Sequence, residues 1–566
     1  MCITFLRLFR LYINYFTGLN LFIIQKQLTL YIDCTIFNYL MEEEQEMKKI
    51  VIVGAGPGGL AAAMLLANKG YKVEVYEKQP YIGGRTSEIR LGDYKFDMGP
   101  TFLNMLYIAE EIFELTGRRL QDYVELYDLD PMYELIFHDK KIKMTRNEKE
   151  MVRQINEVFV GNEGGYEKYI QQTQKKLERL APVLQSPMNR FTDMLKPNVI
   201  KAVGELEIGK SLVDTLSQFF KDEELQLAFT FQSKYLGMSP WESPGAFSIL
   251  SYIEHAYGVY HIKGGLNRLT QAMGKVAEEM GVTIHTNCGI KKLVTSGRQV
   301  TGVALENGDY VQADEVIVNG DFGHVMTKMV EPGILKKYTP EKLEKKQLSC
   351  STFMLYLGVN KRFDQLSHHT IWFAKDYRKN VEEITKTKMI SDDPSIYIQN
   401  AVVTDPAVAP AGKSTLYILV PVPNNTSGID WERVKEPFRK MVLEMVAEKL
   451  GEPNLEEFIE EERMITPADW ENDISVYKGA TFNLGHQLTQ MLAFRPRNKF
   501  EELDRCWLVG GGTHPGSGLP IILESARITV NSILAQDKKV LHPVKPLPKV
   551  NVHSKVKNMS KPIVQI

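Results

Sequence analysis

The sequence contains few cysteines, and they are not arranged to bind one another or a metal. The five cysteines are scattered along 566 residues, and none stands in a Cys-x-x-Cys pair. This pattern argues against a disulfide framework or a zinc site and is typical of a reducing compartment. The histidines are dispersed too, apart from the adjacent His368 and His369, which lack metal-ligand spacing. We therefore expect no metal site.

An excess of charge of either sign is also missing. The formal net charge is -2, so nothing in the whole chain indicates nucleic acid as a partner. Hydrophobic residues make up 44% and charged residues 24%. These fractions are ordinary for a globular protein and exclude a largely disordered one. The chain is too long for a single core, so we expect two or more structural units.

No long uninterrupted apolar run opens the chain. The mostly apolar stretch 11–24 is broken by Asn14 and Asn20, which makes it short for a membrane-spanning helix. A run typical of the first strand of a nucleotide-binding unit begins directly after Met47. We therefore expect residues 1–46 to be a non-native or disordered leader, with a membrane anchor as the alternative.

A dinucleotide-binding pattern starts with the β-branched run 49–53, which is typical of a buried parallel strand. It leads into residues 54–59, which fit G-x-G-x-x-G, and then into a helix-forming stretch at 60–68. A second strand-like stretch follows at 71–76. Such a unit holds a pyrophosphate at the helix N-terminus. A glycine-rich turn without a ligand is the alternative.

Individual residues of this unit have distinct expected tasks. Gly54 permits the tight turn, Gly56 lets a pyrophosphate approach the backbone, and Gly59 lets helix and strand pack closely. Glu77 follows the second strand. Its spacing from the first glycine is close to the ~20 residues expected of an acid that binds a ribose 2′-OH. Because its carboxylate would repel a phosphate, an unphosphorylated ribose is favoured.

Motifs after Glu77 favour a flavin nucleotide. In the segment 82–86, Gly84 lets a ligand approach the backbone closely. The guanidinium of Arg85 is suited to bind phosphate or flavin oxygens. A β-turn with a surface arginine is the alternative. The Gly-Pro turn within 97–101 can hold backbone against a flat ring.

The C-terminal part of the chain supplies a second glycine-rich segment. Residues 506–509 are typical of a strand, and the glycine-dense loop 510–518 leads to a helix at 524–534. A loop of this kind can stabilise negative charge at the pyrimidine side of a reduced flavin. No second complete strand–G-x-G-x-x-G–helix unit occurs, so we expect no NAD(P)H site and another electron acceptor.

These motifs resemble those of the bacterial carotenoid desaturases of the phytoene desaturase type. The resemblance rests on GAGPGGL at 54–60, GGRT at 83–86, DMGPT at 97–101, IKGGLNRL at 262–269 and VGGGTHPGSGLP at 509–520. The first motifs are shared with amine oxidases and protoporphyrinogen oxidase, whereas the last loop is more restricted. SCSTFMLYLGVN at 349–360 is most similar to dehydrosqualene (diapophytoene) desaturases.

The resemblance implies a non-covalent FAD and the stepwise desaturation of a long apolar isoprenoid, dehydrosqualene or phytoene, in carotenoid biosynthesis. It also implies a peripheral position at the cytoplasmic face of the cell membrane, with O2 or a quinone as electron acceptor. The expected fold is α/β, with a discontinuous Rossmann-like FAD-binding domain of the two-dinucleotide-binding-domain type and an inserted α+β substrate domain.

We expect this fold to divide the chain into discontinuous domains. The FAD-binding domain is predicted to comprise residues 47–105, 258–325 and 500–537. The substrate domain, which would also contact the membrane, is predicted to comprise residues 106–257 and 326–499. Residues 538–566 are predicted to be a basic, flexible tail.

Patterns between the motifs predict further elements. Residues 282–285, 299–306 and 310–312 are expected to form a β-meander, and residues 315–318 a buried strand. Helices are predicted at 166–180, 212–220 and 434–450, and strands at 353–359 and 416–420.

The residues expected to bind FAD lie in these motifs. They are Gly54, Gly56, Gly58, Gly59, Glu77, Lys78, Gly84, Arg85, Gly99, Pro100, Thr101, Asp321, Gly511, Gly512, Gly518 and Leu519. Hydride transfer to the flavin with proton loss from the neighbouring carbon needs a base, and His514 is the candidate because it lies in the flavin loop. Alternatively, His514 only orients that loop. Asp97 and Asp321 are expected to make local turn or cap hydrogen bonds.

Other functions remain open at this point. One alternative is a terminal-methyl oxygenase of the same family. Such an oxygenase is expected to have a loop of the Asn-Pro-Gly-Gly-Gly type at the position of residues 513–517 of this chain. A carotene isomerase would leave the substrate mass unchanged. An amine or porphyrinogen oxidase and a prenyl-binding carrier without flavin chemistry share the fold.

Overall fold

A parallel sheet is assembled from distant parts of the chain. The computed structural model describes residues 47–550, apart from the side chains of residues 234–236. Neighbouring strands of the five-stranded sheet run parallel in the order β10-β2-β1-β14-β20. They are β1 (Lys49–Val53), β2 (Lys72–Tyr76), β10 (Thr283–His285), β14 (Glu315–Val318) and β20 (Cys506–Leu508). The predicted leader at 1–46 lies outside the described residues.

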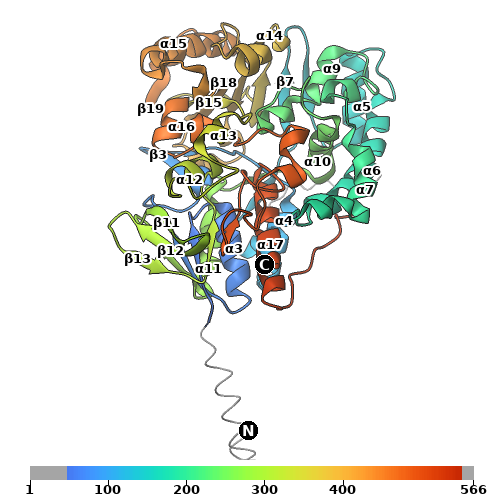
Figure 1. Cartoon of the computed structure of the whole chain (residues 1–566). Coiled ribbons are helices and arrows are strands. Elements are labelled where there is room, and N and C mark those ends of the chain that lie inside the picture. The colour runs from blue at the N-terminus through green and yellow to red at the C-terminus, as the bar shows by residue number, and fades with distance from the viewer. Residues whose placement is uncertain (1–46, 551–566) are drawn as a thin grey trace, which may run out of the picture. The chain divides into compact units, whose positions relative to one another are not determined.

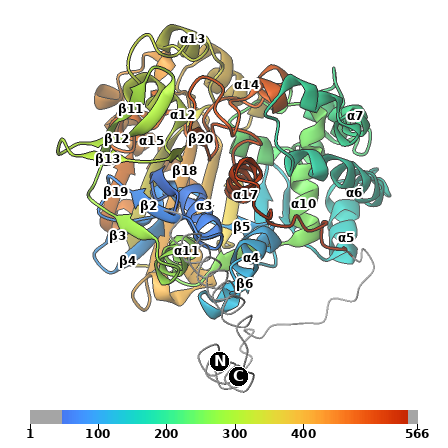
Figure 2. The same ribbon diagram turned by 60° about the horizontal axis from the view of Figure 1, so that its bottom comes forward.

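Helix α3 (Pro57–Ala67) packs against both α11 (Asn267–Glu279) and α17 (Leu519–Gln536) (Figures 1 and 2). Its residues from Gly58 to Leu66 are all buried. Close packing is possible because most of these side chains are small or absent. The N-terminal glycine loop and the C-terminal helix therefore become neighbours although more than 400 residues separate them along the chain.

The predicted meander is wrong at its first strand. β10 pairs with β2 at the edge of the parallel sheet, with Thr283 opposite Glu74. The antiparallel three-stranded sheet instead consists of β11 (Ile290–Ser296), β12 (Gln299–Leu305) and β13 (Tyr310–Gln312). A strand as short as β10 carries no periodicity that could assign it to one sheet or the other.

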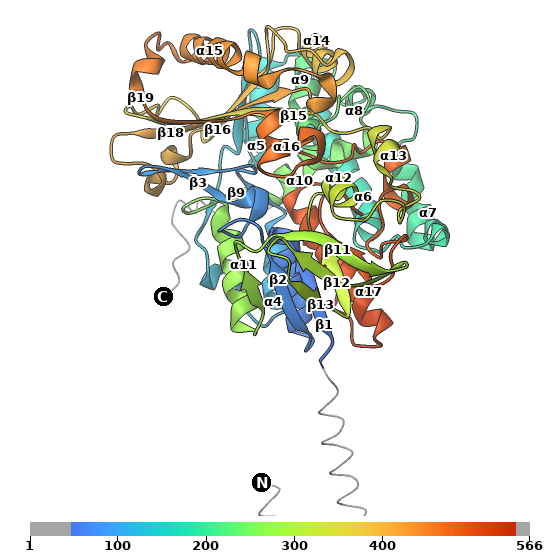
Figure 3. The same cartoon turned by 60° about the vertical axis from the view of Figure 1, so that its left-hand side comes forward.

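A seven-stranded sheet forms the second β-layer, in the order β19-β15-β18-β17-β16-β7-β8. Its strands are β7 (Tyr133–Ile136), β8 (Lys141–Met144), β15 (Ser351–Val359), β16 (His369–Trp372), β17 (Ile396–Gln399), β18 (Ser414–Val422) and β19 (Ile459–Ile465). Helix α15 (Trp431–Leu450) covers one face (Figure 3). The predictions of β15, β18 and α15 are confirmed. The sheet also recruits β7 and β8 from the first predicted insert.

Helices gather beside this sheet (Figure 1). They are α5 (Glu148–Val158), α6 (Gly165–Leu184), α7 (Pro197–Val203), α8 (Leu212–Leu216), α9 (Glu223–Ala228) and α10 (Ile249–Tyr257), whereas α4 (Leu106–Glu114) packs against α17. The helices predicted at 166–180 and 212–220 are thus present. The second one is shorter than expected, because it ends at Leu216 and the chain continues in a turn.

Shorter elements complete the fold. They are β3 (Glu88–Leu91), β4 (Tyr94–Asp97), β5 (Leu103–Asn104), β6 (Leu126–Asp128), β9 (Val259–Ile262), α12 (Phe322–Lys328), α13 (Pro340–Glu344), α14 (Tyr377–Glu382) and α16 (Pro467–Asn472). The described residues from Lys49 onward form one compact unit, so the division into two domains stays a prediction. Within residues 47–550, no helix combines the length and the hydropathy needed to cross a membrane.

The first part of the predicted flexible tail packs on the protein body. His542 is buried, and its Nε2 lies 3.0 Å from the carbonyl oxygen of Leu65 in α3. The side-chain amide of Asn531 donates to the carbonyl oxygen of His542 at 3.0 Å. These contacts anchor the chain after α17, although residues 540–550 form neither helix nor strand.

Candidate active site

The two glycine-rich segments line one cavity. Its volume of about 660 Å³ falls in the range of ~300–1,000 Å³ usual for ligand sites. The predicted site residues on its wall are Gly54, Gly56, Glu77, Lys78, Gly84, Arg85, Gly99, Pro100, Thr101, Asp321, Gly511, Gly518 and Leu519. The N-terminal and C-terminal motifs therefore face the same space.

Two long helices begin at this cavity. α3 starts after Gly56 and α17 after Gly518, and neither N-terminus has a side-chain cap. Uncapped helix N-termini present free backbone N–H groups and the positive end of the helix dipole. This arrangement suits a pyrophosphate at α3 and a negatively charged flavin oxygen at α17.

The position of Glu77 at the end of β2 is fixed by the backbone around it. One carboxylate oxygen accepts a hydrogen bond from the backbone nitrogen of Ala55 and the other from that of Gln79, both at 2.9 Å. Glu77 is buried and lines the cavity. The carboxylate thus lies next to the glycine turn, as the binding of an adenosine ribose would require.

Arg85 and Asp321 connect the nucleotide-binding motifs to a later loop. Arg85 Nη1 donates to the carbonyl oxygen of Thr481 at 2.6 Å. Burial lowers the pKa of Arg85, and the Asp321 carboxylate opposes that shift. Asp321 Oδ1 accepts hydrogen bonds from the backbone nitrogens of His324 and Tyr477, both at 3.2 Å. The expectation that Asp321 caps a helix is confirmed.

Gly58, Gly59 and Gly512 lie behind the cavity wall. A Cβ at Gly59 would lie 2.3 Å from the carbonyl oxygen of Gly54, and a Cβ at Gly58 would lie 2.6 Å from Cγ1 of Val509. A Cβ at Gly512 would lie 2.5 Å from that of Phe322. These glycines permit close packing, as predicted for Gly59, and their contact with the cofactor stays a prediction.

His514 does not line the cavity. It is buried, and its Nε2 lies 3.0 Å from the carbonyl oxygen of Ser186. Its own carbonyl oxygen accepts a hydrogen bond from Asn498 at 3.0 Å. Burial lowers the pKa of His514 to about 4. These contacts fit the alternative role of orienting the loop, and the role of catalytic base stays a prediction.

Asn319 belongs to the site but was not among the predicted residues. Its side-chain amide donates to the carbonyl oxygen of Gly54 at 3.0 Å, and it lines the cavity. The available signal was its place directly after β14, since ligands of parallel sheets bind beyond the carboxyl ends of the strands.

One face of the seven-stranded sheet forms another wall, which sequence reasoning also missed. Alternate residues point to opposite faces, so Phe353 and Ile418 pack towards α15 while their neighbours face the cavity. The sheet residues on the cavity wall are Thr352, Met354, Ile371, Ile396, Tyr397, Tyr417, Leu419 and Pro421. Most of this wall is apolar.

Tyrosines of this sheet also hold the Gly-Pro turn. Tyr356 Oη donates to the carbonyl oxygen of Met98 at 2.5 Å, and Tyr417 Oη donates to that of Gly99 at 2.7 Å. Both tyrosines lie on neighbouring strands in direct register. The turn that is expected to lie against the flavin is therefore held in place by the seven-stranded sheet.

Known proteins resemble this arrangement in sequence and in fold. The family model described as flavin containing amine oxidoreductase matches residues 57–534. A 4,4'-diapophytoene desaturase (4,4'-diapolycopene-forming) of Methylomonas sp is 49% identical over 86% of this chain and 95% of that protein. The chain belongs to the carotenoid desaturases of this flavin-containing family. A zeta-carotene-forming phytoene desaturase of Myxococcus xanthus is 35% identical over 87% of this chain and 95% of its own length.

Solved structures agree with the fold of this flavoprotein. Putrescine oxidase bound to putrescine has a TM-score of 0.57 and 14% identity, with 86% of this chain and 99% of that chain covered. An oxidoreductase from Methanosarcina mazei has a TM-score of 0.55 and 17% identity, with 86% and 100% covered. At these identities the likeness establishes the fold alone.

The cavity fits FAD, and the protein is an FAD-dependent oxidoreductase. Glu77 would hold the ribose, the N-terminus of α3 the pyrophosphate, and the Gly99 turn with the N-terminus of α17 the flavin. When bound, FAD accepts a hydride, which no side chain can do. The surrounding chain orients the substrate and excludes water.

Proposed function

We propose that this protein desaturates 4,4'-diapophytoene or phytoene in carotenoid biosynthesis, and that the flavin is held without a covalent bond. This proposal rests on the cavity, which has nucleotide-binding motifs at one end and the mostly apolar face of the seven-stranded sheet as another wall. Met354, Ile371 and Leu419 offer an apolar chain a surface from which water is excluded. The names of the two desaturases of similar sequence support the same substrates.

An amine substrate is less well matched by this wall. An ammonium group taken from water is stabilised best by a carboxylate. Among the described residues, the strands of the seven-stranded sheet contribute no acidic side chain to the cavity wall. The acids that line the cavity, Glu77, Glu306 and Asp321, belong to the nucleotide-binding part.

The test is co-expression with a diapophytoene synthase or with a phytoene synthase in a bacterium without carotenoids. We expect a coloured polyene with one of the synthases, and each new double bond lowers its mass by two hydrogen atoms. The matched control is Gly56→Val, which places a branched side chain where the pyrophosphate approaches and should leave the cells colourless. An unchanged mass would indicate an isomerase, and a gain of oxygen would indicate a methyl oxygenase.

We also propose that a cluster of exposed apolar residues beside α7 contacts the lipid surface. Phe191 is 59% exposed, Leu195 72%, Ile200 57% and Ile208 66%. The ring of Phe191 lies 5.5 Å from that of Phe494, which continues the patch. Contiguous exposed apolar side chains mark interaction surfaces, and the proposed substrate is itself lipid-soluble. A peripheral position at the cytoplasmic face would give the electrons access to a quinone, with O2 as the other acceptor.

Flotation with liposomes tests this surface. We expect wild-type protein to float with the vesicles and Leu195→Glu/Ile200→Glu to stay in the soluble fraction, because charged side chains resist burial in lipid. Tyr310→Glu is the control, since Tyr310 is 52% exposed on β13, on the opposite side of the molecule in Figures 1 and 2. Equal flotation of all three proteins would refute the assignment of this patch.

A further inference from the structure

Tyr397 is a polar side chain in the mostly apolar wall of the cavity. Tyr397 in β17 stands in register between Ile371 of β16 and Leu419 of β18. Its hydroxyl lies 2.6 Å from Oγ1 of Thr101 and 2.8 Å from Nδ1 of His369. Both Thr101 and Tyr397 line the cavity, whereas His369 lies behind it. A hydrogen-bonded chain therefore leads from the cavity to a buried imidazole.

The imidazole of His369 is held neutral. The side chain is 1% exposed, and its ring packs edge-on against Phe102 at 5.3 Å and against His368 at 4.4 Å. Burial lowers the pKa of His369 to about 3, with a smaller effect from His261. A neutral ring can carry its hydrogen on Nε2, and Nδ1 then accepts from the Tyr397 hydroxyl. Tyr397 in turn accepts from Thr101.

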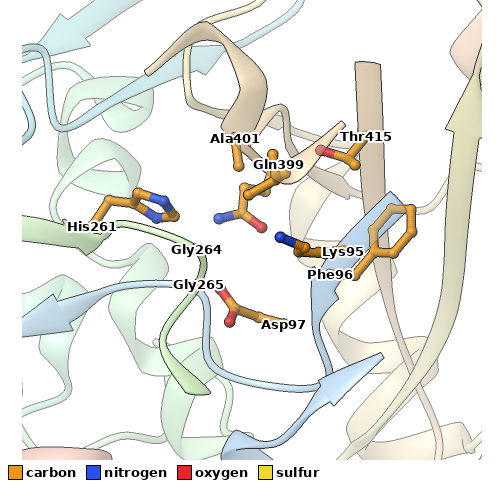
Figure 4. A pocket seen from close by; sticks show the side chains of 10 residues that line it. Lys95, Phe96, Asp97, His261, Gly264, Gly265, Gln399, Ala401 and Thr415 are labelled. Atoms are coloured by element: carbon orange, nitrogen blue, oxygen red, sulfur yellow. The ribbon is translucent and has the colours of Figure 1, made fainter. Parts of the chain in front are cut away.

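Figure 4 shows a small hollow with several polar side chains at its wall. Asp97, His261 and Gln399 line this hollow. Gln399 donates to the carbonyl oxygen of Thr101 at 3.3 Å. Burial raises the pKa of Tyr397, and Asp97 raises it further, so its hydroxyl keeps its proton at neutral pH.

His261 does not belong to the hydrogen-bonded chain that links Thr101, Tyr397 and His369. Its Nε2 lies 3.1 Å from Oδ2 of Asp405, which also accepts from the backbone nitrogen of Gly264. His368 Nδ1 lies 2.9 Å from Oγ1 of Thr404. Of the three neighbouring histidines, His369 is thus the one whose ring nitrogen bonds to a side chain of the cavity wall.

We propose that Tyr397 is the catalytic residue that receives the proton lost by the substrate, and that His369 is its positioning residue and takes up the proton of the phenol. This inference rests on the proposed desaturation. A substrate C–H bond breaks and its proton forms an O–H bond at Tyr397 Oη, while the original Tyr397 O–H bond breaks and an N–H bond forms at His369 Nδ1. The electron pair of the C–H bond becomes the new π bond. The other hydrogen leaves the adjacent carbon as a hydride, for which the FAD of this family is the oxidant.

A weak base is sufficient for this step. Loss of a hydride from an allylic carbon leaves a cation whose neighbouring C–H bond is strongly acidic. An imidazole of low basicity can therefore accept the proton through Tyr397, and it also releases the proton readily afterwards. General bases of this kind contribute typically ~10²–10⁴-fold to a rate.

The test compares Tyr397→Phe with Tyr417→Phe in full-length, FAD-loaded protein supplied with substrate in liposomes. Each variant loses one hydroxyl from the same wall, but that of Tyr417 donates to a carbonyl oxygen and not to an imidazole. We expect Tyr397→Phe to slow the formation of desaturated product in an anaerobic single turnover by ~10²-fold or more. Its FAD dissociation constant, measured by flavin fluorescence, should stay within about twofold of wild type. Tyr417→Phe should slow product formation much less than Tyr397→Phe does.

Two further measurements separate proton transfer from a structural role. ¹⁵N NMR of histidine-labelled protein should show His369 Nδ1 as an unprotonated acceptor, with a resonance that moves in Tyr397→Phe and not in Tyr417→Phe. His369→Ala should be slow and should recover part of its rate with added imidazole. A Tyr397→Phe rate within twofold of wild type, or loss of FAD from that variant, would overturn the proposal. Failure of the proposed function itself would appear differently, as wild-type protein that forms no desaturated product.

Discussion

The side-chain amide of Asn319 donates to the carbonyl oxygen of Gly54 at 3.0 Å and so ties the end of β14 to the turn after β1. Gly54 adopts a φ of +93°, a conformation that other residues rarely take. The hydrogen bond therefore stabilises a turn that glycine permits but does not enforce. The turn before α3 is therefore held by a side chain from another strand as well as by its own glycine.

We expect Asn319→Leu to weaken both folding and FAD binding. The carbonyl oxygen of Gly54 would lose its side-chain partner, which costs ~1–3 kcal/mol when the group is buried. Chemical denaturation and flavin fluorescence measure the two effects. Asn307→Leu, in an exposed turn, is the control and should change neither. An unaltered Asn319→Leu protein would show that the turn is stable without this bond.

Gly59→Ala should destabilise the protein by more than ~2 kcal/mol, because its Cβ would lie 2.3 Å from the backbone oxygen of Gly54 and the helix would have to move. Gly204→Ala is the control, since no atom lies within 4 Å of the added Cβ and its φ is -61°. We expect that control to be neutral or slightly stabilising. Equal midpoints of denaturation for the two variants would contradict the packing role of Gly59.

Glu77→Gln should raise the FAD dissociation constant by about 10–100-fold. Hydrogen bonds to a charged group are worth ~1.5–3 kcal/mol, and the amide loses the charge that strengthens those to Ala55 and the ribose. Glu74→Gln is the matched control, because Glu74 lies on the same strand and pairs with Lys49 away from the cavity. If both variants bind FAD like wild type, Glu77 is not the ribose acid.

His514→Gln should flatten the dependence of stability on pH. The unfolded chain takes up a proton on this imidazole below about pH 6.5, whereas the folded protein does so only near pH 4. Acidification between these values therefore favours the unfolded state, by up to ~1.4 kcal/mol per pH unit. The wild-type free energy of unfolding should fall more steeply than that of the variant over this interval, and the difference should vanish above pH 7. Parallel curves would mean that His514 is protonated equally in both states.

The sequence by itself determined the nucleotide-binding unit around β1, α3 and β2, because that unit is encoded by neighbours along the chain. Strand period, glycine spacing and the acid after β2 are all local. The position of Glu77 beside Ala55 follows from this short stretch.

Only the tertiary structure decided which side chains meet across long distances. Side chains of a β-strand alternate between the two faces of the sheet, but the sequence does not show which face lines a cavity. Tyr397 therefore could not be distinguished from a tyrosine of the core. The same limit applies to β10, which joined the parallel sheet, and to His514, which lies in the glycine-dense loop but has its ring next to Ser186. Segments far apart in the chain pack together to form the contacts between Thr101, Tyr397 and His369. Local sequence patterns do not predict such contacts.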